Sequence, residues 1–448
     1  MFHVHYRAMK DALLSRIHDR TARIGVIGQG YVGLPLALLF HEAGFHVTGF
    51  DVDPRKVESL RKGESFIKHI GAERVATAVK SGKYHATADF DGLRDCDAIA
   101  ICVPTPLGAH REPDNSFIHA TGREIAKRLR PGQLVLLEST TYPGTTDEEL
   151  QPILETSGLV CGREFFLAFS PEREDPGRKD FDTKTTAKLV GGVDAVSTEL
   201  AVALYRTGVA KVVPVSSARV AESAKLLENV FRSVNIALVN ELKTVFDRMD
   251  IDIWEVIEAA KTKPFGFMPF YTGPGLGGHC IPLDPFYLSW KAAEHGQWAR
   301  FVELAGEINT SMPRWVVAKV ADALNGDSKA VKGSRILVLG LAYKANIDDD
   351  RESPSYEIIE LLQESGALVD YCDPYFPEAR KGRKFDLKLR TVPCTPESFA
   401  RYDAVLVATA HEPFKNASLY QQAKLVVDTR NLVAPLFLAG GGPRIVKA

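Results

Sequence analysis

The sequence has no strong excess of charge of either sign, no long hydrophobic run and few cysteines. Its 448 residues carry 55 basic and 57 acidic side chains, a balance that gives no overall field to attract nucleic acid or an anionic membrane. No stretch approaches the roughly 20 apolar residues of a membrane helix, and the charged N-terminus lacks a signal-peptide core. The six cysteines have no paired spacing, which indicates neither a disulfide framework nor a metal site such as zinc. We therefore expect a cytoplasmic protein that holds any anionic ligand at local sites.

Short apolar runs alternate with helical patterns in the first half of the chain, as is typical of a parallel sheet with helices on both faces. The runs are residues 23–28, 46–50, 97–103, 133–138, 165–169 and 211–215. A second set of this kind comprises residues 335–340, 367–371, 404–409 and 424–428. The length also exceeds what one hydrophobic core usually supports. The predicted fold class is α/β, with two Rossmann-like doubly wound domains joined by a long helical connector.

The connector is a helical pattern over residues 218–249, with a shorter leading helix expected over residues 8–20. Apolar residues recur along the connector every three or four positions, which indicates one stripe of a helix. They are Leu227, Phe231, Val234, Leu238, Leu242 and Val245. The stripe is longer than one small domain needs, so we expect it to form a homodimer. The expected domains are 1–215 for dinucleotide binding, 216–325 as a central helical dimerisation domain with a cysteine loop, and 326–448 for a second ligand.

A glycine-rich turn, Gly-Gln-Gly-Tyr-Val-Gly over residues 28–33, follows the first apolar run and opens a helical pattern. Its glycines permit a tight turn and let a pyrophosphate approach a helix N-terminus. Asp51 ends the second run, where an acidic side chain binds the ribose of NAD and repels the extra phosphate of NADP. Arg55 and Lys56 lie nearby and keep NADP open as an alternative. We expect NAD, and the turn residues expected to contact it are Gly28, Gly30, Tyr31, Val32 and Gly33.

A cysteine ends a second glycine-rich segment, Gly-Pro-Gly-Leu-Gly-Gly-His-Cys over residues 273–280. Glycines allow close backbone approach, and a thiolate at Cys280 is a nucleophile that can form a covalent intermediate. Asp284 adds a carboxylate four residues later. The alternative is a flexible loop that ends in a buried, inert cysteine, because free cysteine is usually buried.

Three polar residues of the connector, Lys225, Asn229 and Arg232, stand at i, i+4 and i+7 and share one face of the predicted helix. A lysine beside an amide can stabilise an oxyanion and hold a water molecule, which a cysteine-bound intermediate requires. The alternative is the solvated face of any amphipathic helix.

Further polar side chains follow the ends of the predicted strands, where doubly wound folds bind their ligands. These residues are Thr105, Thr140, Glu172, Arg173, Lys344, Arg351 and Arg430. Each also has a structural explanation as a turn residue, a helix cap or a solvated charge. The second domain lacks the glycine fingerprint of the first, so we expect it to bind a different anion.

Together these motifs resemble the UDP-glucose/GDP-mannose dehydrogenase family, over residues 23 to about 430. The segment before the cysteine loop, Lys-Pro-Phe-Gly-Phe-Met-Pro-Phe-Tyr over residues 263–271, and the Asp-Pro-Phe-Tyr-Leu of residues 284–288 are similar to the branch that oxidises UDP-N-acetylglucosamine. Members of the family oxidise the sugar 6-hydroxyl to a carboxylate with two NAD and do not release the aldehyde. The resemblance implies an enzyme of surface polysaccharide precursor synthesis.

The resemblance also implies a role for each matching residue. It makes Cys280 the nucleophile, Lys225 the acid/base and oxyanion partner, Asn229 an oxyanion or water ligand, Asp284 the group that positions thiol or water, and Glu172 an aid to hydrolysis. It assigns NAD binding to Asp51, Lys56, Thr105, Thr140 and Arg351. It assigns sugar-nucleotide binding to Arg173, Arg232, Gly277, Lys344 and Arg430. The UDP-glucose branch carries a second glutamate where Pro176 stands here, which argues against simple UDP-glucose specificity.

The expected chemistry removes four electrons in one active site. A thiohemiacetal on Cys280 would trap the aldehyde and restore a carbon from which the second hydride leaves, and the resulting thioester would be hydrolysed. Within the family, UDP-N-acetylmannosamine, UDP-N-acetylgalactosamine, UDP-glucose and GDP-mannose remain alternative substrates. A two-electron hydroxy-acid dehydrogenase and a non-catalytic nucleotide-sugar binder are more distant alternatives.

Overall fold

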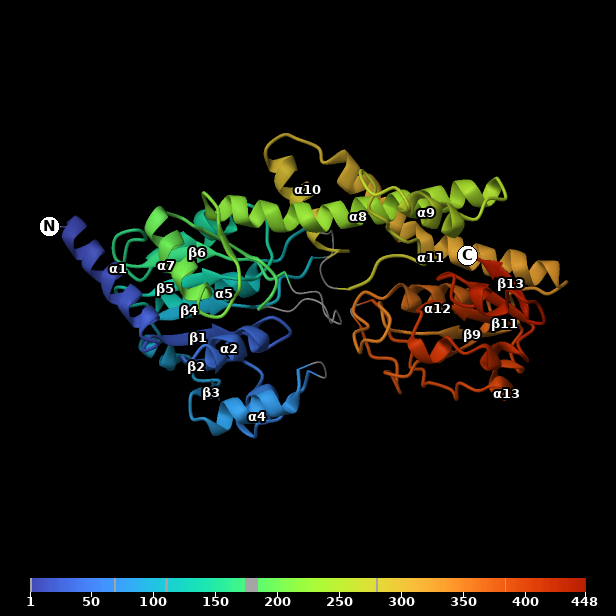
Figure 1. Ribbon diagram of the computed structural model, residues 1–448, viewed down its shortest axis with the longest axis horizontal. Coiled ribbons are helices and arrows are strands. Elements are labelled where there is room, and N and C mark those ends of the chain that lie inside the picture. Colours follow the sequence, from blue (N-terminus) through green and yellow to red (C-terminus); the bar gives the residue numbers. More distant parts are fainter. Residues whose placement is uncertain (1, 68–69, 109–111, 174–183, 279–280, 383) are drawn as a thin grey trace. The chain divides into compact units, whose positions relative to one another are not determined.

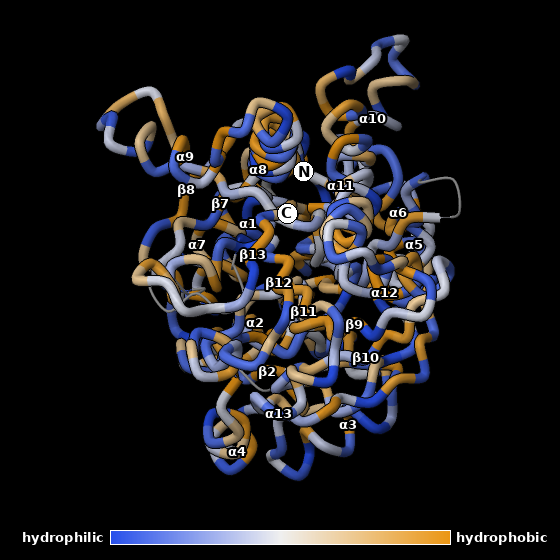
Figure 2. Tube along the Cα trace, turned by 90° about the vertical axis from the view of Figure 1, so that its right-hand side faces the viewer, coloured by the Kyte–Doolittle hydropathy of each residue, from blue (hydrophilic) through white to orange (hydrophobic). Residues whose placement is uncertain are grey.

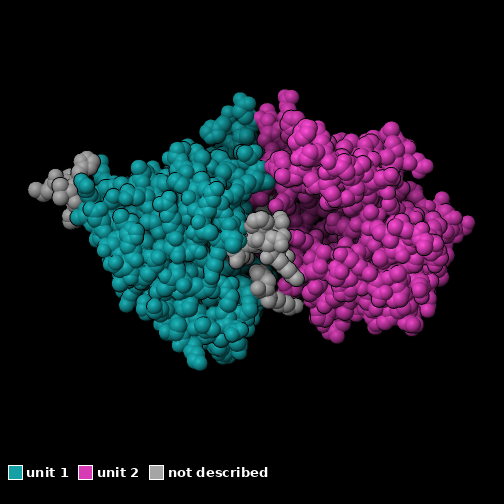
Figure 3. All heavy atoms as spheres, in the orientation of Figure 1, with its two compact units in different colours: residues 1–228, 286–297 teal, residues 229–285, 298–448 magenta. Residues whose placement is uncertain are grey.

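The computed structural model describes residues 2–67, 70–108, 112–173, 184–278, 281–382 and 384–448. The chain divides into two compact units, coloured separately in Figure 3. Unit 1 comprises residues 1–228 and 286–297, and unit 2 comprises residues 229–285 and 298–448. The prediction of a mixed α/β chain with two doubly wound sheets is confirmed.

Unit 1 is built on an eight-stranded sheet with the order β3-β2-β1-β4-β5-β6-β7-β8 (Figure 1). Its strands are β1 (Arg23–Ile27), β2 (His46–Phe50), β3 (Tyr84–Thr87), β4 (Ala98–Ile101), β5 (Leu134–Leu137), β6 (Phe166–Phe169), β7 (Lys188–Gly192) and β8 (Val212–Pro214). All neighbouring strands are parallel except β6 and β7, which pair antiparallel. The strand order reverses between β1 and β4, the switch point where such sheets bind ligands at the carboxyl ends of their strands.

Helices cover this sheet, and the leading helix is one of them. The helices and helical turns are α1 (Phe2–His18), α2 (Gly33–Glu42), α3 (Pro54–Arg61), α4 (Ala72–Lys80), η1 (Phe90–Asp95), α5 (Ser116–Ala126), η2 (Thr145–Leu150), α6 (Gln151–Glu155) and α7 (Ala195–Tyr205). Helix α1 buries Leu13 and Ile17 in the core, and its Lys10 pairs with Glu199 of α7 at 3.1 Å. It begins earlier than expected and serves as part of the core.

The connector is the 31-residue helix α8 (Ala218–Arg248), close to the predicted range. It is followed by α9 (Ile253–Lys261), α10 (Asp284–Glu294) and α11 (Arg300–Gly326). Within unit 2, α8 and α11 are joined by a buried pair of amides, because Asn240 donates to Asn309 Oδ1 at 3.0 Å. The Asn309 amide in turn donates to the carbonyl of Ser233 at 3.1 Å.

Unit 2 contains a five-stranded parallel sheet with the order β10-β9-β11-β12-β13. Its elements are β9 (Arg335–Leu339), α12 (Pro354–Glu364), β10 (Leu368–Cys372), α13 (Pro396–Phe399), β11 (Ala404–Val407), η3 (Glu412–Phe414), η4 (Ala417–Tyr420), β12 (Leu425–Asp428), η5 (Ala434–Phe437) and β13 (Arg444–Lys447). Figure 2 shows hydrophobic residues concentrated along β11 and β12, as expected for strands that are buried on both faces.

Candidate active site

The glycine turn after β1 has the geometry that a dinucleotide requires. Gly28 adopts φ +90°, and a Cβ there would lie 2.5 Å from the carbonyl oxygen of Cys102. A Cβ at Gly33 would collide with the carbonyl of Gly28, so both positions need glycine. Among the described residues, nothing lies within 4 Å of a Cβ placed on Gly30. The backbone at Gly30 is therefore open to a pyrophosphate at the N-terminus of α2.

Asp51 ends β2 beside this turn and is almost fully buried. Its carboxylate accepts hydrogen bonds from the backbone N–H of Gln29 at 2.9 Å and of Asp53 at 2.9 Å. Its ion pair with Lys56 measures 3.2 Å. The structure thus brings the glycine turn, Asp51 and Lys56 together, and the residues fit a dinucleotide whose ribose reaches Asp51. Tyr31 and Val32 lie on the turn and pack partly against the core.

Two further loops leave the carboxyl ends of β4 and β5, next to the switch point. Thr105 is buried, and its carbonyl accepts a hydrogen bond from the hydroxyl of Tyr287 in α10. Thr140 is half-buried in the loop after β5, where the hydroxyl of Ser139 donates to the carbonyl of Val103 at 2.7 Å. Both threonines therefore lie on the ligand-binding edge of the sheet.

A buried glutamate fastens the loop after β5 to the start of α8. Glu222 accepts hydrogen bonds from the backbone N–H of Gly144 at 2.8 Å and of Thr146 at 3.0 Å, and from the Thr146 hydroxyl at 2.6 Å. Burial raises the pKa of Glu222 to about 7, although these hydrogen bonds favour its charged form. No pattern in the sequence indicates that Glu222 has this role.

Glu172 and Arg173 follow β6 and join a buried cluster of charges. One Glu172 oxygen accepts the backbone N–H of Arg173 at 2.7 Å, and the other lies 3.4 Å from Lys188 Nζ. Arg173 forms an ion pair with Glu228 of α8 and donates to the carbonyl of Ala187 at 2.7 Å. Lys188 was not predicted as a site residue, because nothing in the sequence around a single lysine indicates that it is buried.

The polar face of α8 is buried, and much of its apolar stripe is exposed. Lys225 and Asn229 are each less than one-tenth exposed, whereas Leu227 is 67% exposed. The amide of Asn229 donates to Asp284 Oδ2 at 2.6 Å, which links two of the expected catalytic residues. Arg232 is exposed and does not share their burial. The solvated-face alternative is therefore wrong for Lys225 and Asn229.

The glycine loop is fastened at several points within unit 2. Gly273 N–H donates to Asn240 Oδ1 at 3.1 Å, and Gly278 N–H donates to the carbonyl of Arg351 at 2.9 Å. A Cβ on Gly277 would lie 2.4 Å from Tyr343 Cβ, the neighbour of Lys344, so glycine is required for this packing. Cys280, the expected nucleophile, lies outside the described residues, between two segments that are described.

Arg430 lies against the start of the same loop. A Cβ on Gly273 would approach Arg430 Nη1 to 2.3 Å, and Arg430 Nε donates to the carbonyl of Ala408 at 2.9 Å. Burial lowers the pKa of Arg430 to about 10. Close to it on α8, Lys243 is buried, and no hydrogen-bond partner for its Nζ is found among the described residues. Burial first, and then the charge of Arg430, lower the pKa of Lys243 to about 7.

The second sheet has its own carboxylate at the position that corresponds to Asp51. Asp373 follows β10, and its Oδ2 accepts the backbone N–H groups of Leu341 at 2.6 Å and Ala342 at 3.2 Å. The fully buried His411 takes the N–H of Asn346 on Nδ1 and directs Nε2 at the same Asp373 oxygen, 3.1 Å away. This carboxylate is therefore fully engaged in holding the loop after β9.

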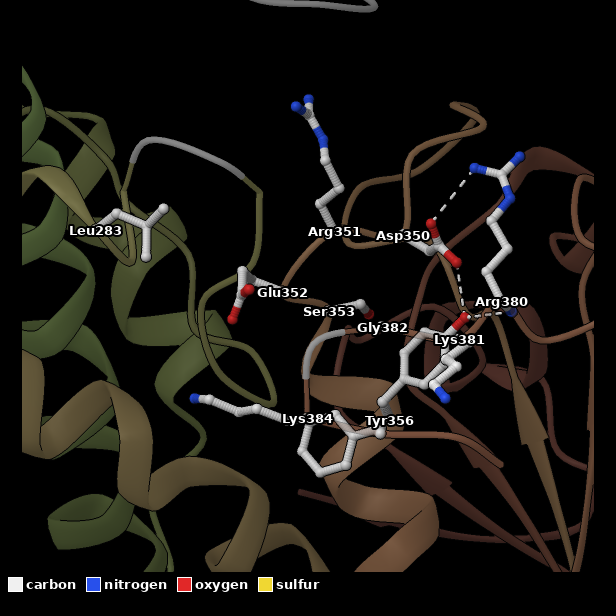
Figure 4. A pocket seen from close by; sticks show the side chains of 11 residues that line it. Leu283, Asp350, Arg351, Glu352, Ser353, Tyr356, Arg380, Lys381, Gly382 and Lys384 are labelled. Atoms are coloured by element: carbon white, nitrogen blue, oxygen red, sulfur yellow. Dashed lines mark hydrogen bonds and ion pairs between the residues drawn. The ribbon is translucent and has the colours of Figure 1, made fainter. Parts of the chain in front are cut away.

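A cavity of about 500 Å³ in unit 2 is lined by the loop before α12 and by Leu283, three residues after Cys280 (Figure 4). Arg380 pairs with Asp350 at 3.5 Å, and Asp350 accepts the hydroxyl of Tyr356 at 2.6 Å. Arg351 extends away from that pair in Figure 4 and forms a two-pronged ion pair with Asp349. Leu283, just before α10, and the Arg351 loop thus border one cavity.

These features define an NAD-binding oxidoreductase with a separate domain for a second ligand. They are a doubly wound sheet with a dinucleotide-binding turn, a long helix, and a second α/β unit of different build. The models of the UDP-glucose/GDP-mannose dehydrogenase family match residues 22–209 as the NAD binding domain, 219–311 as the central domain and 337–435 as the UDP binding domain. The chain belongs to this family. It is an NAD-dependent nucleotide-sugar dehydrogenase.

Relatives and a solved structure agree over nearly the whole chain. A UDP-N-acetyl-D-glucosamine 6-dehydrogenase of Pseudomonas aeruginosa is 36% identical over 90% of this chain and 94% of its own length. A UDP-N-acetyl-D-mannosamine dehydrogenase of Pyrococcus horikoshii is 33% identical, covering 92% of this chain and 96% of its own. The solved structure of a UDP-D-ManNAc dehydrogenase from P. horikoshii superposes with a TM-score of 0.85 at 32% identity, covering 95% of this chain and 98% of that one.

No helix in the described part of the chain has both the length and the apolar character needed to cross a bilayer. The same residues contain no cluster of three or more histidine, cysteine or acidic side chains arranged to hold a metal ion.

Proposed function

We propose that the enzyme oxidises the 6-hydroxyl of UDP-N-acetylglucosamine to the carboxylate with two NAD, in a four-electron reaction. The observation that carries this proposal is the attachment of the glycine loop before Cys280 to the Arg351 loop, the Tyr343 ring and Arg430, all within one unit. Such attachment holds the backbone of residues 273–278 beside Arg430 and Tyr343, the neighbour of Lys344, and both cations are expected to hold the sugar nucleotide. The Pseudomonas relative supports the choice of N-acetylglucosamine, and the Pyrococcus relatives make UDP-N-acetylmannosamine the second candidate.

The side chains have complementary roles in this scheme. NAD, when bound, would supply the hydride acceptor for the sugar carbon. Thr105 and Thr140, on the ligand-binding edge of the sheet, would contact it, and Arg351 is a further expected contact. Lys225 moves the proton of the 6-hydroxyl and stabilises the oxyanion, and Asn229 holds the oxygen from the same face of α8. Asp284, bound to the Asn229 amide, orients that amide and the thiol of Cys280. Glu172 then assists hydrolysis of the thioester.

The sugar nucleotide is assigned to cations of the second unit and of the central region. Lys344 and Arg430 follow β9 and β12, Gly277 gives close backbone approach, and Arg173 and Arg232 complete the set. Guanidinium and ammonium groups are the usual partners of a diphosphate. The proposed division into residues 1–215, 216–325 and 326–448 follows these roles and agrees in order with the three matched family models.

A substrate panel tests the proposal. UDP- and GDP-sugars are offered with NAD, and NADH is counted per sugar by nicotinamide absorbance. Two NADH per UDP-N-acetylglucosamine are expected, whereas one would indicate a simple two-electron dehydrogenase, and none with any sugar would indicate a binding protein. The variant Cys280→Ser should lose acid formation. The matched control Cys161→Ser, a half-buried thiol whose pKa burial raises to about 12, should retain it.

We propose a homodimer formed by two copies of α8. Leu238 and Val245 are 50% and 45% exposed, and with the exposed Leu227 and Phe231 they follow the spacing of a helix-packing seam. A self-complementary stripe along one helix suits a twofold axis, at which the same surface meets itself. The double variant Leu238→Glu/Val245→Glu should therefore be monomeric by light scattering. Leu438→Glu, a change at an 88% exposed leucine in another region, should remain dimeric. A monomeric unmodified protein at micromolar concentration would contradict the proposal.

A further inference from the structure

The buried charges behind Glu172 form a cluster of one cation and two anions. Lys188 on β7 is 4% exposed and Glu138 at the end of β5 is fully buried, and they form an ion pair of 2.8 Å. Glu172 is 14% exposed and lies 3.4 Å from the same Lys188 Nζ. The remaining Glu138 oxygen accepts the hydroxyl of Tyr205 on α7. Glu172 is thus the most exposed of the three charged groups.

Lys188 is shared unequally between its two neighbouring carboxylates, Glu138 and Glu172. Burial alone would lower the pKa of Lys188, but Glu138 and Glu172 raise it, so the ammonium remains charged. The shorter contact joins Lys188 to the sealed Glu138, and buried ions persist only when paired in this way. Within the described residues, the two carboxylates exceed the one cation by a single negative charge, and Glu172 is the carboxylate at the edge of the cluster. Among the same residues, the other groups that face the cluster are Tyr205, Arg173 and the buried thiol of Cys102.

The geometry of Glu172 is that of a carboxylate held at both oxygens. One oxygen takes the N–H of Arg173, and the other faces the Lys188 ammonium, whose third contact is the carbonyl of Pro171 at 3.3 Å. Arg173 is itself tied to the carbonyl of Ala187, the residue before Lys188. The loop after β6 is thus attached to β7 through both side chains, which fixes the direction of the Glu172 carboxylate.

We propose that Lys188 is a positioning residue for the hydrolytic step, and that it holds Glu172 ionised and oriented to accept a proton from the attacking water. This inference rests on the proposed function. In the step, the water oxygen bonds to the thioester carbon while Glu172 takes one water proton. The carbon–sulfur bond then breaks, the Cys280 sulfur leaves as thiolate, and the proton on Glu172 returns to sulfur or solvent. No electron is transferred, and no further reactant is needed.

Two substitutions with opposite electrostatic effects test the proposal. Lys188→Met removes the cation beside Glu172, so the apparent pKa of hydrolysis should rise by at least one unit, and at pH values below that apparent pKa the step should be about tenfold slower. The acyl-enzyme should then accumulate and be visible by intact-mass analysis after quenching, while the first burst of NADH stays within about twofold. In Glu138→Gln, Glu172 becomes the one carboxylate of the cluster that pairs with Lys188, and the repulsion from Glu138 is lost. The same apparent pKa should therefore fall. Lys188→Arg retains the charge and should restore a pH profile close to that of the unmodified enzyme.

Control variants separate positioning from folding. Lys184→Met, at a surface lysine that pairs with Glu42, should leave the pH profile and the acyl-enzyme level unchanged. If Lys188→Met does not fold, the double variant Lys188→Met/Glu138→Gln removes both buried charges. It should still raise the apparent pKa, because the lost cation was nearer to Glu172 than the lost anion. Unshifted pH profiles in the folded variants, with no acyl-enzyme, would overturn the role of Lys188. One NADH per sugar in the unmodified enzyme would instead overturn the proposed function.

Discussion

Replacement of Lys243 by methionine is expected to stabilise the second unit. The Lys243 ammonium is buried against the Trp315 ring, 4.8 Å from its centroid, and no hydrogen-bond partner for it is found in the described part of the chain. A buried lysine of this kind favours its neutral form, and the pKa of Lys243 falls from 10.5 to about 7. Methionine has a similar length and no charge to desolvate.

The magnitude follows from linkage between protonation and folding. The folded pKa of about 7 lies below the unfolded value of 10.5, so the unfolded state binds more protons between these pH values and stability rises with pH across that window. The shift corresponds to about 5 kcal/mol of lost stability below pH 7, at about 1.4 kcal/mol per unit. The contact with Trp315 offsets about 1–2 kcal/mol of that cost. Lys243→Met should therefore be about 3 kcal/mol more stable at pH 6, and the difference should shrink as pH approaches 10.

Urea unfolding at pH 6, 8 and 10, followed by tryptophan fluorescence, measures this difference. Trp254, Trp298 and Trp315 all belong to unit 2 and report its unfolding. Lys319→Met is the matched control, because Lys319 faces the same ring at 5.8 Å but pairs with Asp247 at 2.8 Å. It should not stabilise the protein. A Lys243→Met variant that is less stable at pH 6, or whose advantage does not change with pH, would refute the reasoning.

Two further predictions concern buried carboxylates of unit 1. Asp51→Asn keeps an acceptor for the Gln29 N–H but loses the charge, so KM for NAD should rise about tenfold, KM for NADP should fall, and kcat should change little. Steady-state kinetics with both cofactors check this, and unchanged discrimination would contradict a ribose role. For Glu222, the folded pKa of about 7 lies above its ordinary value, so its contribution to stability is full below pH 4.5 and is lost as pH rises through 7. Glu222→Gln should remove that decline, which is at most about 3 kcal/mol, and parallel stability-against-pH curves for the two proteins would disprove the assignment.

The sequence allowed most strands of both sheets to be predicted, because they are continuous apolar runs buried on both faces. It did not reveal β3, β7 or β13. Strand β7 contains Gly191 and Gly192, where a Cβ would collide with backbone atoms of Ser217 and Thr198, so close packing rather than an apolar pattern defines it. Strand β13 has a largely half-exposed pattern and little apolar signal.

The sequence predicted the candidate site only where the residues that form it are near one another along the chain. The glycine turn and Asp51 are such a case, because a strand, a turn and a helix follow one another in sequence. The buried face of α8 could not be predicted in this way, because an amphipathic pattern does not show which face of a helix the rest of the protein covers. In α8 the polar face is the covered one. Lys188 and Glu138 are separated by 50 residues and meet only through the sheet order, which no local pattern contains.

Asp373 does not offer the second sheet a ribose site like that of Asp51. Its carboxylate receives four backbone N–H groups and faces the imidazole of His411, and, unlike the carboxylate of Asp51, it is fully buried together with its partner. In the proposed four-electron reaction, the dinucleotide site at the glycine turn would then serve both oxidations in succession. The half-oxidised sugar would have to remain on the enzyme while spent NADH departs and fresh NAD enters. The dwell time of the covalent intermediate, rather than hydride transfer itself, would then decide whether any aldehyde escapes.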